Sequence, residues 1–229
     1  MDPNRHGEMS DERETTARLL DTAERLFAES GYDGVGMRAL ADEAKVNLGA
    51  ATYHFGSKEQ LYIETFMRRF RPTHARRMRM LQAAEAQSGG EPLSVEEIVE
   101  CMLRPPFDSG LEHPAFQKFL ARNLLMAPEF LRPAIHKELA PGVITFAAAL
   151  RRVLPEIPED LIHLRSMFAM GGLLMFSIRA TELPQMKNPQ LHEAVLREMV
   201  AYVSAGMKSR PATRQAERPP FPLPPKPKR

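Results

Sequence analysis

The sequence predicts an all-α fold. Apolar residues recur every three or four positions along most of the chain, which is the spacing of one face of a helix. Helix caps and prolines separate these runs, whereas the alternation of apolar and polar residues that marks a strand is nearly absent. Together these patterns predict about nine or ten helices.

Composition places the chain among ordinary globular proteins. Its 229 residues are 43% hydrophobic and 26% charged, which suits one large domain or two modest ones. The single cysteine, Cys101, excludes an intramolecular disulfide and a cysteine-rich zinc site. No apolar run approaches the roughly 20 residues that span a bilayer, and residues 1–16 are polar where a signal peptide is apolar. We expect a soluble, cytoplasmic protein with no membrane partner.

The N-terminal part predicts three helices followed by a longer one. Residues 15–30 gather leucine, alanine and phenylalanine on one face, and Gly31 supplies a stop signal. Two short amphipathic helices are expected over 37–44 and 47–55, the second with an asparagine N-cap. The segment Ser57-Lys-Glu-Gln60 has the form of a capping box, so we expect the long helix to begin there.

Caps and prolines delimit the later helices. Ser94 and Glu97 repeat the capping box and open a helix that Pro105-Pro106 should end. Another helix should begin at Pro114, because a proline is tolerated at the first helical position. Three further prolines should divide the helical region that follows, and they are Pro128, Pro133 and Pro141.

The chain closes with a long apolar helix expected over 158–183, an amphipathic helix over 189–208 and a tail. The tail, residues 210–229, holds seven prolines and six basic residues, so we expect it to be disordered or polyproline-like.

Positive charge is concentrated in this tail and in residues 38–79, which contain nine Lys or Arg and four Asp or Glu. Both segments could meet a polyanion such as nucleic acid.

The segment from residue 34 to residue 61 has a distinctive amino-acid sequence. It reads Gly34-Val-Gly-Met-Arg-Ala-Leu-Ala-Asp-Glu-Ala-Lys-Val-Asn-Leu-Gly-Ala-Ala-Thr-Tyr-His-Phe-Gly-Ser-Lys-Glu-Gln-Leu61 and places two short helices, joined by a turn, in the basic segment. The preceding helix carries Ala23-x-x-Leu-Phe-x-x-x-Gly31-Tyr. Over about residues 13–71 the chain resembles the DNA-binding domain of the TetR family of transcriptional regulators.

The resemblance implies a division of the chain into four parts. These are a flexible arm at 1–12, a three-helix helix-turn-helix DNA-binding domain at 13–73 with its motif at about 36–55, a helical effector-binding and dimerisation domain at 74–209, and the basic tail at 210–229. In this family such a protein binds a palindromic site on double-stranded DNA as a homodimer, because two recognition helices must reach successive major grooves about 34 Å apart.

Small and polar residues of the motif suit a helix lying in the major groove. Glycine and alanine let the backbone approach, Thr52 can offer its hydroxyl or methyl group to a base edge, and the ring tips of Tyr53 and His54 can donate to phosphates. By resemblance, Lys58 contacts a phosphate and Arg38 reaches a phosphate or the groove edge. The expected DNA-contacting residues are Arg38, Asn47, Gly49, Ala50, Thr52, Tyr53, His54 and Lys58.

Two residues depart from the family pattern. Gly36 stands where the family commonly has Thr or Ser as the N-cap of the second helix, and Thr52 stands where many members have tyrosine. The arginine run from Arg68 to Arg79 is interpreted as a solvated face or as a partner of the acidic first helix.

The remainder of the chain is expected to hold an effector pocket and a dimer interface. Methionine and phenylalanine suit a cavity that accepts ligands of variable shape, and a few polar residues could orient a head group. The pocket candidates are Met102, Phe107, Phe116, Leu120, Arg122, Asn123, Leu124, Met126, Phe146, Met167 and Met170. The interface candidates, on the last two helices, are Ala169, Gly172, Leu173, Phe176, Leu191, Val195, Met199 and Tyr202.

Enzymatic signatures are missing from the sequence. The seven histidines and Cys101 show no metal-binding spacing, and no nucleotide loop or nucleophile elbow occurs, so we expect no enzyme activity, metal or cofactor. The expected function is a homodimeric repressor that a small, largely apolar effector releases from DNA. The alternatives are a DNA-binding regulator without an effector, and a helical ligand-binding or interaction protein that has lost DNA binding.

Overall fold

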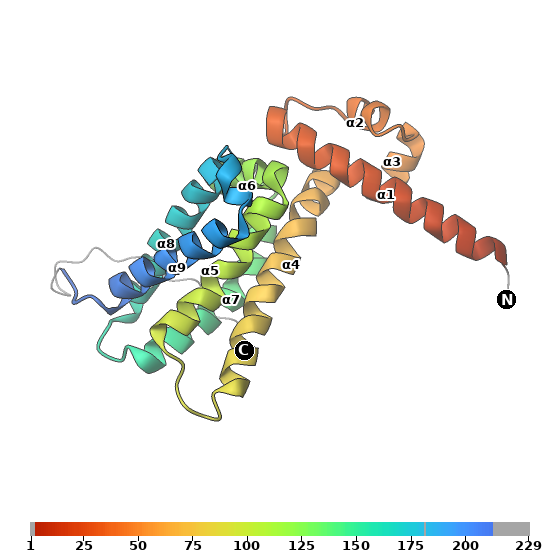
Figure 1. Ribbon diagram of the computed structural model, residues 1–229. Helices are drawn as coiled ribbons and strands as arrows, with labels where there is room; N and C mark the ends of the chain where they lie inside the picture. The colour runs from red at the N-terminus through yellow and green to blue at the C-terminus, as the bar shows by residue number, and fades with distance from the viewer. Residues whose placement is uncertain (1–2, 181, 213–229) are drawn as a thin grey trace. The chain divides into compact units, whose positions relative to one another are not determined.

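The computed structural model describes the backbone of residues 3–180 and 182–212, and the side chains of the same residues apart from 3–11 and 125. Every regular element within these residues is a helix, which agrees with the predicted fold class (Figure 1). The elements are α1 (Pro3–Ser30), α2 (Met37–Glu43), α3 (Leu48–Phe55), α4 (Lys58–Gln87), α5 (Val95–Glu112), α6 (Pro114–Met126), α7 (Arg132–Val153), α8 (Glu159–Ala180), the 3-10 helix η1 (Pro184–Lys187) and α9 (Pro189–Lys208).

Most helix starts lie where the caps predict them. Asn188 caps α9 by accepting a hydrogen bond from the Gln190 amide at 2.9 Å. The capping box of α5 is complete, because Ser94 Oγ accepts from the Glu97 amide at 3.2 Å while the Glu97 carboxylate accepts from the Ser94 amide at 2.7 Å. The start of α1 is a correction: its backbone is helical from Pro3, within the expected arm, because residues 8–14 contain good helix formers and no stop signal.

Prolines interrupt fewer helices than predicted. Pro105 and Pro106 lie inside α5, Pro141 lies inside α7, and Pro72 lies inside α4. A proline removes one backbone donor and bends a helix, but the helix continues where packing favours it. Around Pro105, which is itself buried, the buried side chains of Met102 and Phe107 supply that packing.

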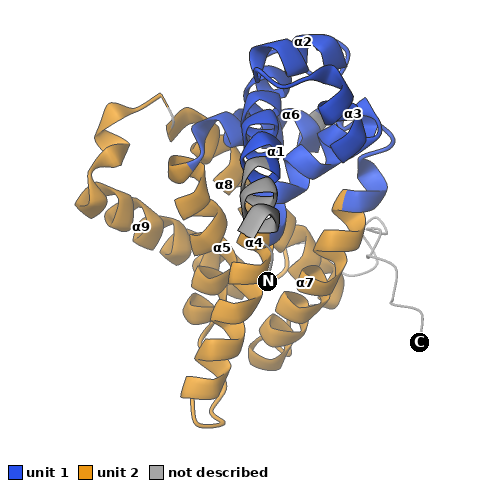
Figure 2. Cartoon of the chain, turned by 90° about the vertical axis from the view of Figure 1, so that its right-hand side faces the viewer, with its two compact units in different colours: residues 1–71, 113–134 blue, residues 72–112, 135–229 orange. Residues whose placement is uncertain are grey.

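The chain folds into two compact units that do not follow the expected linear division (Figure 2). The first unit contains residues 1–71 and 113–134, and the second contains 72–112 and 135–229. The boundary within α4 lies close to the expected residue 73. Helix α6, however, belongs to the first unit, although it was expected in the effector domain, because its apolar face packs on α1.

The core of the first unit is aromatic. Tyr62 is 1% exposed, and its ring lies 4.6 Å from the ring of Phe27 and 5.0 Å from that of Phe119 on α6. The Tyr62 hydroxyl donates to Asn123 Oδ1 at 2.8 Å, and Asn123 Nδ2 donates to the Phe119 carbonyl at 2.8 Å. Helix α6 is therefore held to this unit by both ring packing and a buried polar pair.

The second unit packs α5 against α8 and α9, as Figure 1 shows. Its buried cluster includes Met102, Phe107, Phe146, Leu150 and Leu196. Among the described residues α8 is long and apolar enough to cross a membrane by length and composition, contrary to the expectation from sequence. A core helix passes the same test, so this composition alone does not place α8 in a bilayer.

Candidate nucleic-acid interface

Helix α3 is fixed in the first unit by its cap and by two buried side chains. Asn47 Oδ1 accepts a hydrogen bond from the Gly49 amide at 2.7 Å, which satisfies one donor at the helix start. Ala51 and Phe55 are buried at 0% and 8% exposure. Because these residues recur at i and i+4, they turn one face of α3 inward and leave the opposite face to solvent.

The outward face of α3 carries the residues that sequence reasoning assigns to DNA. Asn47, Gly49, Thr52 and Tyr53 are exposed, and Tyr53 reaches 82% exposure. The Thr52 hydroxyl donates to the Leu48 carbonyl at 2.9 Å, which leaves its lone pairs and methyl group outward. A Cβ on Gly49 would lie 3.0 Å from Asn47 Oδ1, so glycine leaves room for the cap at this position.

The remaining predicted contacts flank this face. Ala50 and His54 are half-buried, and Arg38 near the start of α2 is exposed. His54 lines a surface groove together with Glu12, Thr16 and Arg68. The N-cap of α2 is Gly36, which makes no side-chain cap bond, so at this position backbone amides are the available donors.

Lys58 stands at the first position of α4, where unpaired amides favour an anion. Its Nζ lies 4.1 Å from the centre of the Tyr32 ring, a cation–π contact that orients the ammonium group. Ser57 Oγ accepts from the Gln60 amide at 3.1 Å, as the capping box predicts, but the Gln60 side chain donates to Glu64 at 3.1 Å and leaves the box half formed.

The arginines that follow in α4 pair with α1. Arg68 Nη2 lies 2.6 Å from Asp21 Oδ1, and Arg69 Nε lies 3.2 Å from Glu24 Oε2. This is the pairing with the acidic first helix that the sequence suggested. This pairing reduces the positive charge that Arg68 and Arg69 present to solvent.

Two family models match the chain, one in its N-terminal part and one in its C-terminal part. Residues 19–65 match the model described as bacterial regulatory proteins, tetR family, and residues 99–206 match the tetracyclin repressor-like C-terminal domain. The chain belongs to the TetR family.

Curated relatives of this TetR-family chain match in the N-terminal region. The HTH-type transcriptional repressor NemR of Escherichia coli is 32% identical over 74 residues, which are 32% of this chain and 37% of NemR. The repressor AcnR of Corynebacterium efficiens is 42% identical over 45 residues, which are 20% of this chain and 24% of AcnR. The chain thus covers only about a quarter to two fifths of the length of these relatives.

Similarity to solved structures extends along most of the chain. The fatty acid degradation regulator FadR of Bacillus halodurans has a TM-score of 0.60 at 18% identity, over 86% of this chain and 97% of that one. The ketosteroid transcriptional regulator KstR2 of Mycobacterium tuberculosis has a TM-score of 0.59 at 18% identity, over 83% and 93%. At these identities the likeness shows a shared fold.

The structure divides the predicted pocket residues between the two units. The candidates on α6 belong to the first unit and are Phe116, Leu120, Arg122, Asn123, Leu124 and Met126. Of these, Asn123 is held by Tyr62, whereas Leu124 and Met126 are 46% and 80% exposed. Phe116 is part of the aromatic core, Leu120 is half-buried and Arg122 is exposed against Gly31.

The other pocket candidates belong to the second unit. Met102 and Phe146 are core residues, Met170 is partly buried, and Met167 is 57% exposed. Phe107 is the one pocket candidate that lines a small apolar crevice, which it shares with Phe176 and Met186 and which is too narrow to admit a water molecule.

The residues predicted to form the dimer interface differ in their exposure. Ala169 and Leu173 are 7% and 2% exposed and pack in the core of their own unit, which corrects their assignment to an interface. Gly172, Leu191 and Tyr202 are exposed, whereas Phe176, Val195 and Met199 are half-buried against the core.

Sequence reasoning missed the residues that α8 actually presents to solvent. They are Phe168 and Met175, with Met167, at 68%, 61% and 57% exposure. Helix α8 is apolar on nearly all sides, so its sequence contained no polar face from which the direction of the core could be inferred.

Proposed function

We propose that the chain is a sequence-specific DNA-binding transcriptional repressor. The observation that carries this proposal is the outward face of α3, where small and polar residues flank the 82% exposed Tyr53 beside the half-buried Lys58. Such a face suits the major groove, because the backbone can approach the bases while ring tips and an ammonium group meet phosphates. The names of the curated relatives that match this region favour the same function.

The proposed repressor acts as a homodimer joined through α8 and α9. Met167, Phe168 and Met175 form an exposed apolar stripe on α8, and Tyr202 on α9 is 82% exposed. We call these four residues the α8/α9 stripe. Large exposed apolar groups on two helices that pack together favour an interaction surface, and a Cβ at Gly171 or Gly172 would meet nothing within 4 Å, which suits close approach of a second helix.

A small, largely apolar effector would release the proposed dimer from DNA. The methionine-rich core of the second unit supports such a ligand, because methionine side chains adapt to varied shapes. An effector that binds more tightly to a conformation with the wrong spacing of recognition helices shifts the population away from the DNA-binding state.

The test is a selection of genomic fragments with the purified full chain, followed by titration of the recovered site at two salt concentrations. We expect a palindromic site, bound by two copies, with an affinity that falls steeply as salt rises because phosphate contacts release counterions. Recovery of no site by a stable dimer would contradict the proposal and favour a helical binding protein.

A further inference from the structure

Two polar side chains on α4, in the second unit, carry buried nitrogen atoms without hydrogen-bond partners. His74 is 7% exposed, and neither of its ring nitrogens has a hydrogen-bond partner. One turn later, Nε of Arg77 is buried and equally unpartnered. Among the described residues no carboxylate forms an ion pair with Arg77, although buried polar groups in folded proteins are almost always satisfied.

Helix α7 closes over this pair with apolar surface. The guanidinium carbon of Arg77 lies 5.0 Å from the centre of the Phe146 ring. The His74 ring lies against the backbone of Gly142, where a Cβ would come within 2.2 Å of its Cε1 atom. Burial lowers the pKa of Arg77 to about 10. Burial, followed by the charge of Arg77, also lowers the pKa of His74, against an opposing effect of Glu138.

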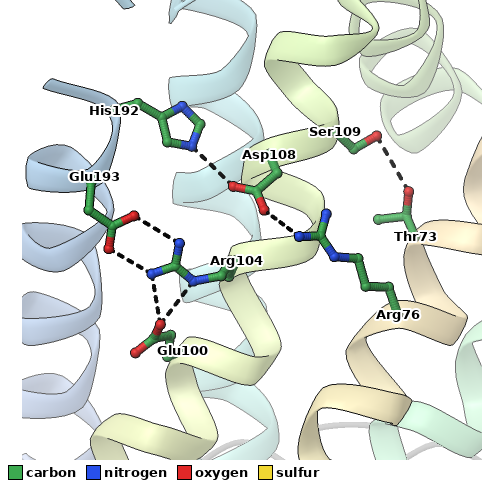
Figure 3. A network of polar contacts seen from close by, with 8 residues as sticks. All are labelled: Thr73, Arg76, Glu100, Arg104, Asp108, Ser109, His192 and Glu193. Atoms are coloured by element: carbon green, nitrogen blue, oxygen red, sulfur yellow. Dashed lines mark hydrogen bonds and ion pairs between the residues drawn. The ribbon is translucent and has the colours of Figure 1, made fainter. Parts of the chain in front are cut away.

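Two other arginines of the same unit, Arg76 and Arg104, are paired with carboxylates. Arg76 Nη2 lies 2.9 Å from Asp108 Oδ2, and that carboxylate also lies 3.0 Å from His192 Nε2, as Figure 3 shows. Arg104 forms a two-bond fork with Glu193 at 2.7 and 2.8 Å. The fold thus supplies carboxylates to the arginines of this polar network and leaves Arg77 without one.

We propose that Arg77 and His74 form the head-group site for a small apolar carboxylate, a class of effector for the function proposed above, on which this inference rests. A guanidinium binds a carboxylate through two parallel hydrogen bonds, and an imidazole N–H can supply a third. One guanidinium balances one negative charge, so a carboxylate fits better than a phosphate dianion. The walls of Phe146 and Gly142 then face the apolar body of the ligand.

The site is closed in this conformation, because Phe146 covers the guanidinium and Gly142 covers the imidazole. A carboxylate that inserts between α4 and α7 selects a conformation in which these helices are further apart. The ligand thereby acts on α4, the helix that begins at Lys58 beside the recognition helix. Binding of the carboxylate is coupled to release of DNA through this shift in the population of conformations.

The experiment measures thermal unfolding of the full chain, without DNA, in a series of straight-chain carboxylates from hexanoate to dodecanoate. Each carboxylate is compared with the primary alcohol of the same length. We expect at least one carboxylate to raise Tm saturably, its alcohol to raise Tm much less, and Arg77→Met to weaken the carboxylate roughly tenfold or more. The matched control is Arg79→Met, at an exposed arginine of the same helix.

Equal stabilisation by carboxylates and alcohols, no binding of any carboxylate, or unchanged affinity in Arg77→Met would each overturn the inference. Ligand-free Arg77→Met provides a second measurement, because an apolar residue that replaces an unpaired buried cation should leave Tm unchanged or higher. A Tm several degrees lower would show that Arg77 stabilises the fold by packing and would also overturn the inference. This unfolding experiment contains no DNA, so its outcome does not depend on whether the chain binds DNA. Failure of the carboxylate proposal and failure of the DNA-binding proposal are therefore distinguished.

Discussion

At the scale of single residues, the polar pair between Tyr62 and Asn123 joins the helix-turn-helix region to α6. Both side chains are nearly fully buried, and their 2.8 Å hydrogen bond joins residues 61 positions apart. Burial raises the pKa of Tyr62, so the hydroxyl remains a donor across the physiological range. Removing the donor leaves Asn123 Oδ1 buried without a partner, which costs more than the bond itself is worth.

Tyr62→Phe should therefore lower the free energy of unfolding by about 1–3 kcal/mol. Chemical denaturation of the full chain measures this change. Tyr53→Phe is the matched control, because Tyr53 is 82% exposed and its hydroxyl faces water. If Tyr62→Phe and the parent chain are equally stable, the hydrogen bond between Tyr62 and Asn123 contributes nothing to the free energy of unfolding.

Lys58 and Thr52 are predicted to differ in the kind of DNA contact that they make. Lys58→Ala should weaken binding to all sequences alike and reduce the slope of log affinity against log salt by about 1, because it removes one phosphate contact. Thr52→Ala should instead change the ranking among operator variants. Titrations of a small operator library at two salt concentrations separate the two effects, and a uniform loss from both variants would contradict the distinction.

His74 should make stability dependent on pH. Its pKa in the folded chain is lowered from the ordinary 6.5, so the unfolded chain binds the proton more readily. The stability that the neutral ring contributes is present above pH 6.5 and declines as pH falls from there through the lowered pKa. Urea titrations at pH 7 and pH 5 measure the loss of unfolding free energy between these two pH values. This loss should be smaller in His74→Phe than in the parent chain. His136→Gln, at an exposed histidine, should show the same loss as the parent chain.

At the scale of the elements, α8 shows why a uniformly apolar helix is hard to orient from sequence. Ala169 and Leu173 pack inward, while Phe168 and Met175 point outward, so the two sets are offset by one or two positions. The presence and length of the helix were predicted well, because they depend on local caps and composition. Its rotation depends on contacts with α5 and α9, which lie at a distance in sequence.

The α8/α9 stripe is expected to hold the dimer together. Phe168→Glu should raise the dimer dissociation constant roughly tenfold or more, because the interface would bury an unpaired carboxylate. Sedimentation equilibrium over a concentration series measures this constant. Gln82→Glu, which introduces the same charge at an exposed position of α4, should leave it unchanged; a stable dimer of Phe168→Glu would exclude the stripe from the interface.

At the scale of the whole molecule, the first unit is discontinuous in sequence. Its aromatic core takes Phe27 and Tyr62 from residues 1–71, and Phe119 from α6 in residues 113–134. A chain that ends at residue 73 would therefore expose one side of this core. The helix-turn-helix residues are necessary for the unit but do not complete it.

A fragment of residues 12–73 should unfold without a cooperative thermal transition, whereas the full chain should show one. Circular dichroism at 222 nm measures both melts. Adding a peptide of residues 113–134 should restore part of the cooperativity, because it supplies the missing aromatic partners. Cooperative melting of the fragment on its own would show that α6 contributes little to this core.

Local sequence was sufficient to predict the helices, their main caps and the outward face of α3, because cap hydrogen bonds and apolar periodicity act within a few residues. It could not assign α6 to the first unit, orient α8, or show that Arg77 lacks a carboxylate while Arg76 and Arg104 have one. These features depend on contacts between segments that are distant in the chain. Only the packed tertiary structure decides which side chains share an interior, and therefore which buried polar groups are left without a partner.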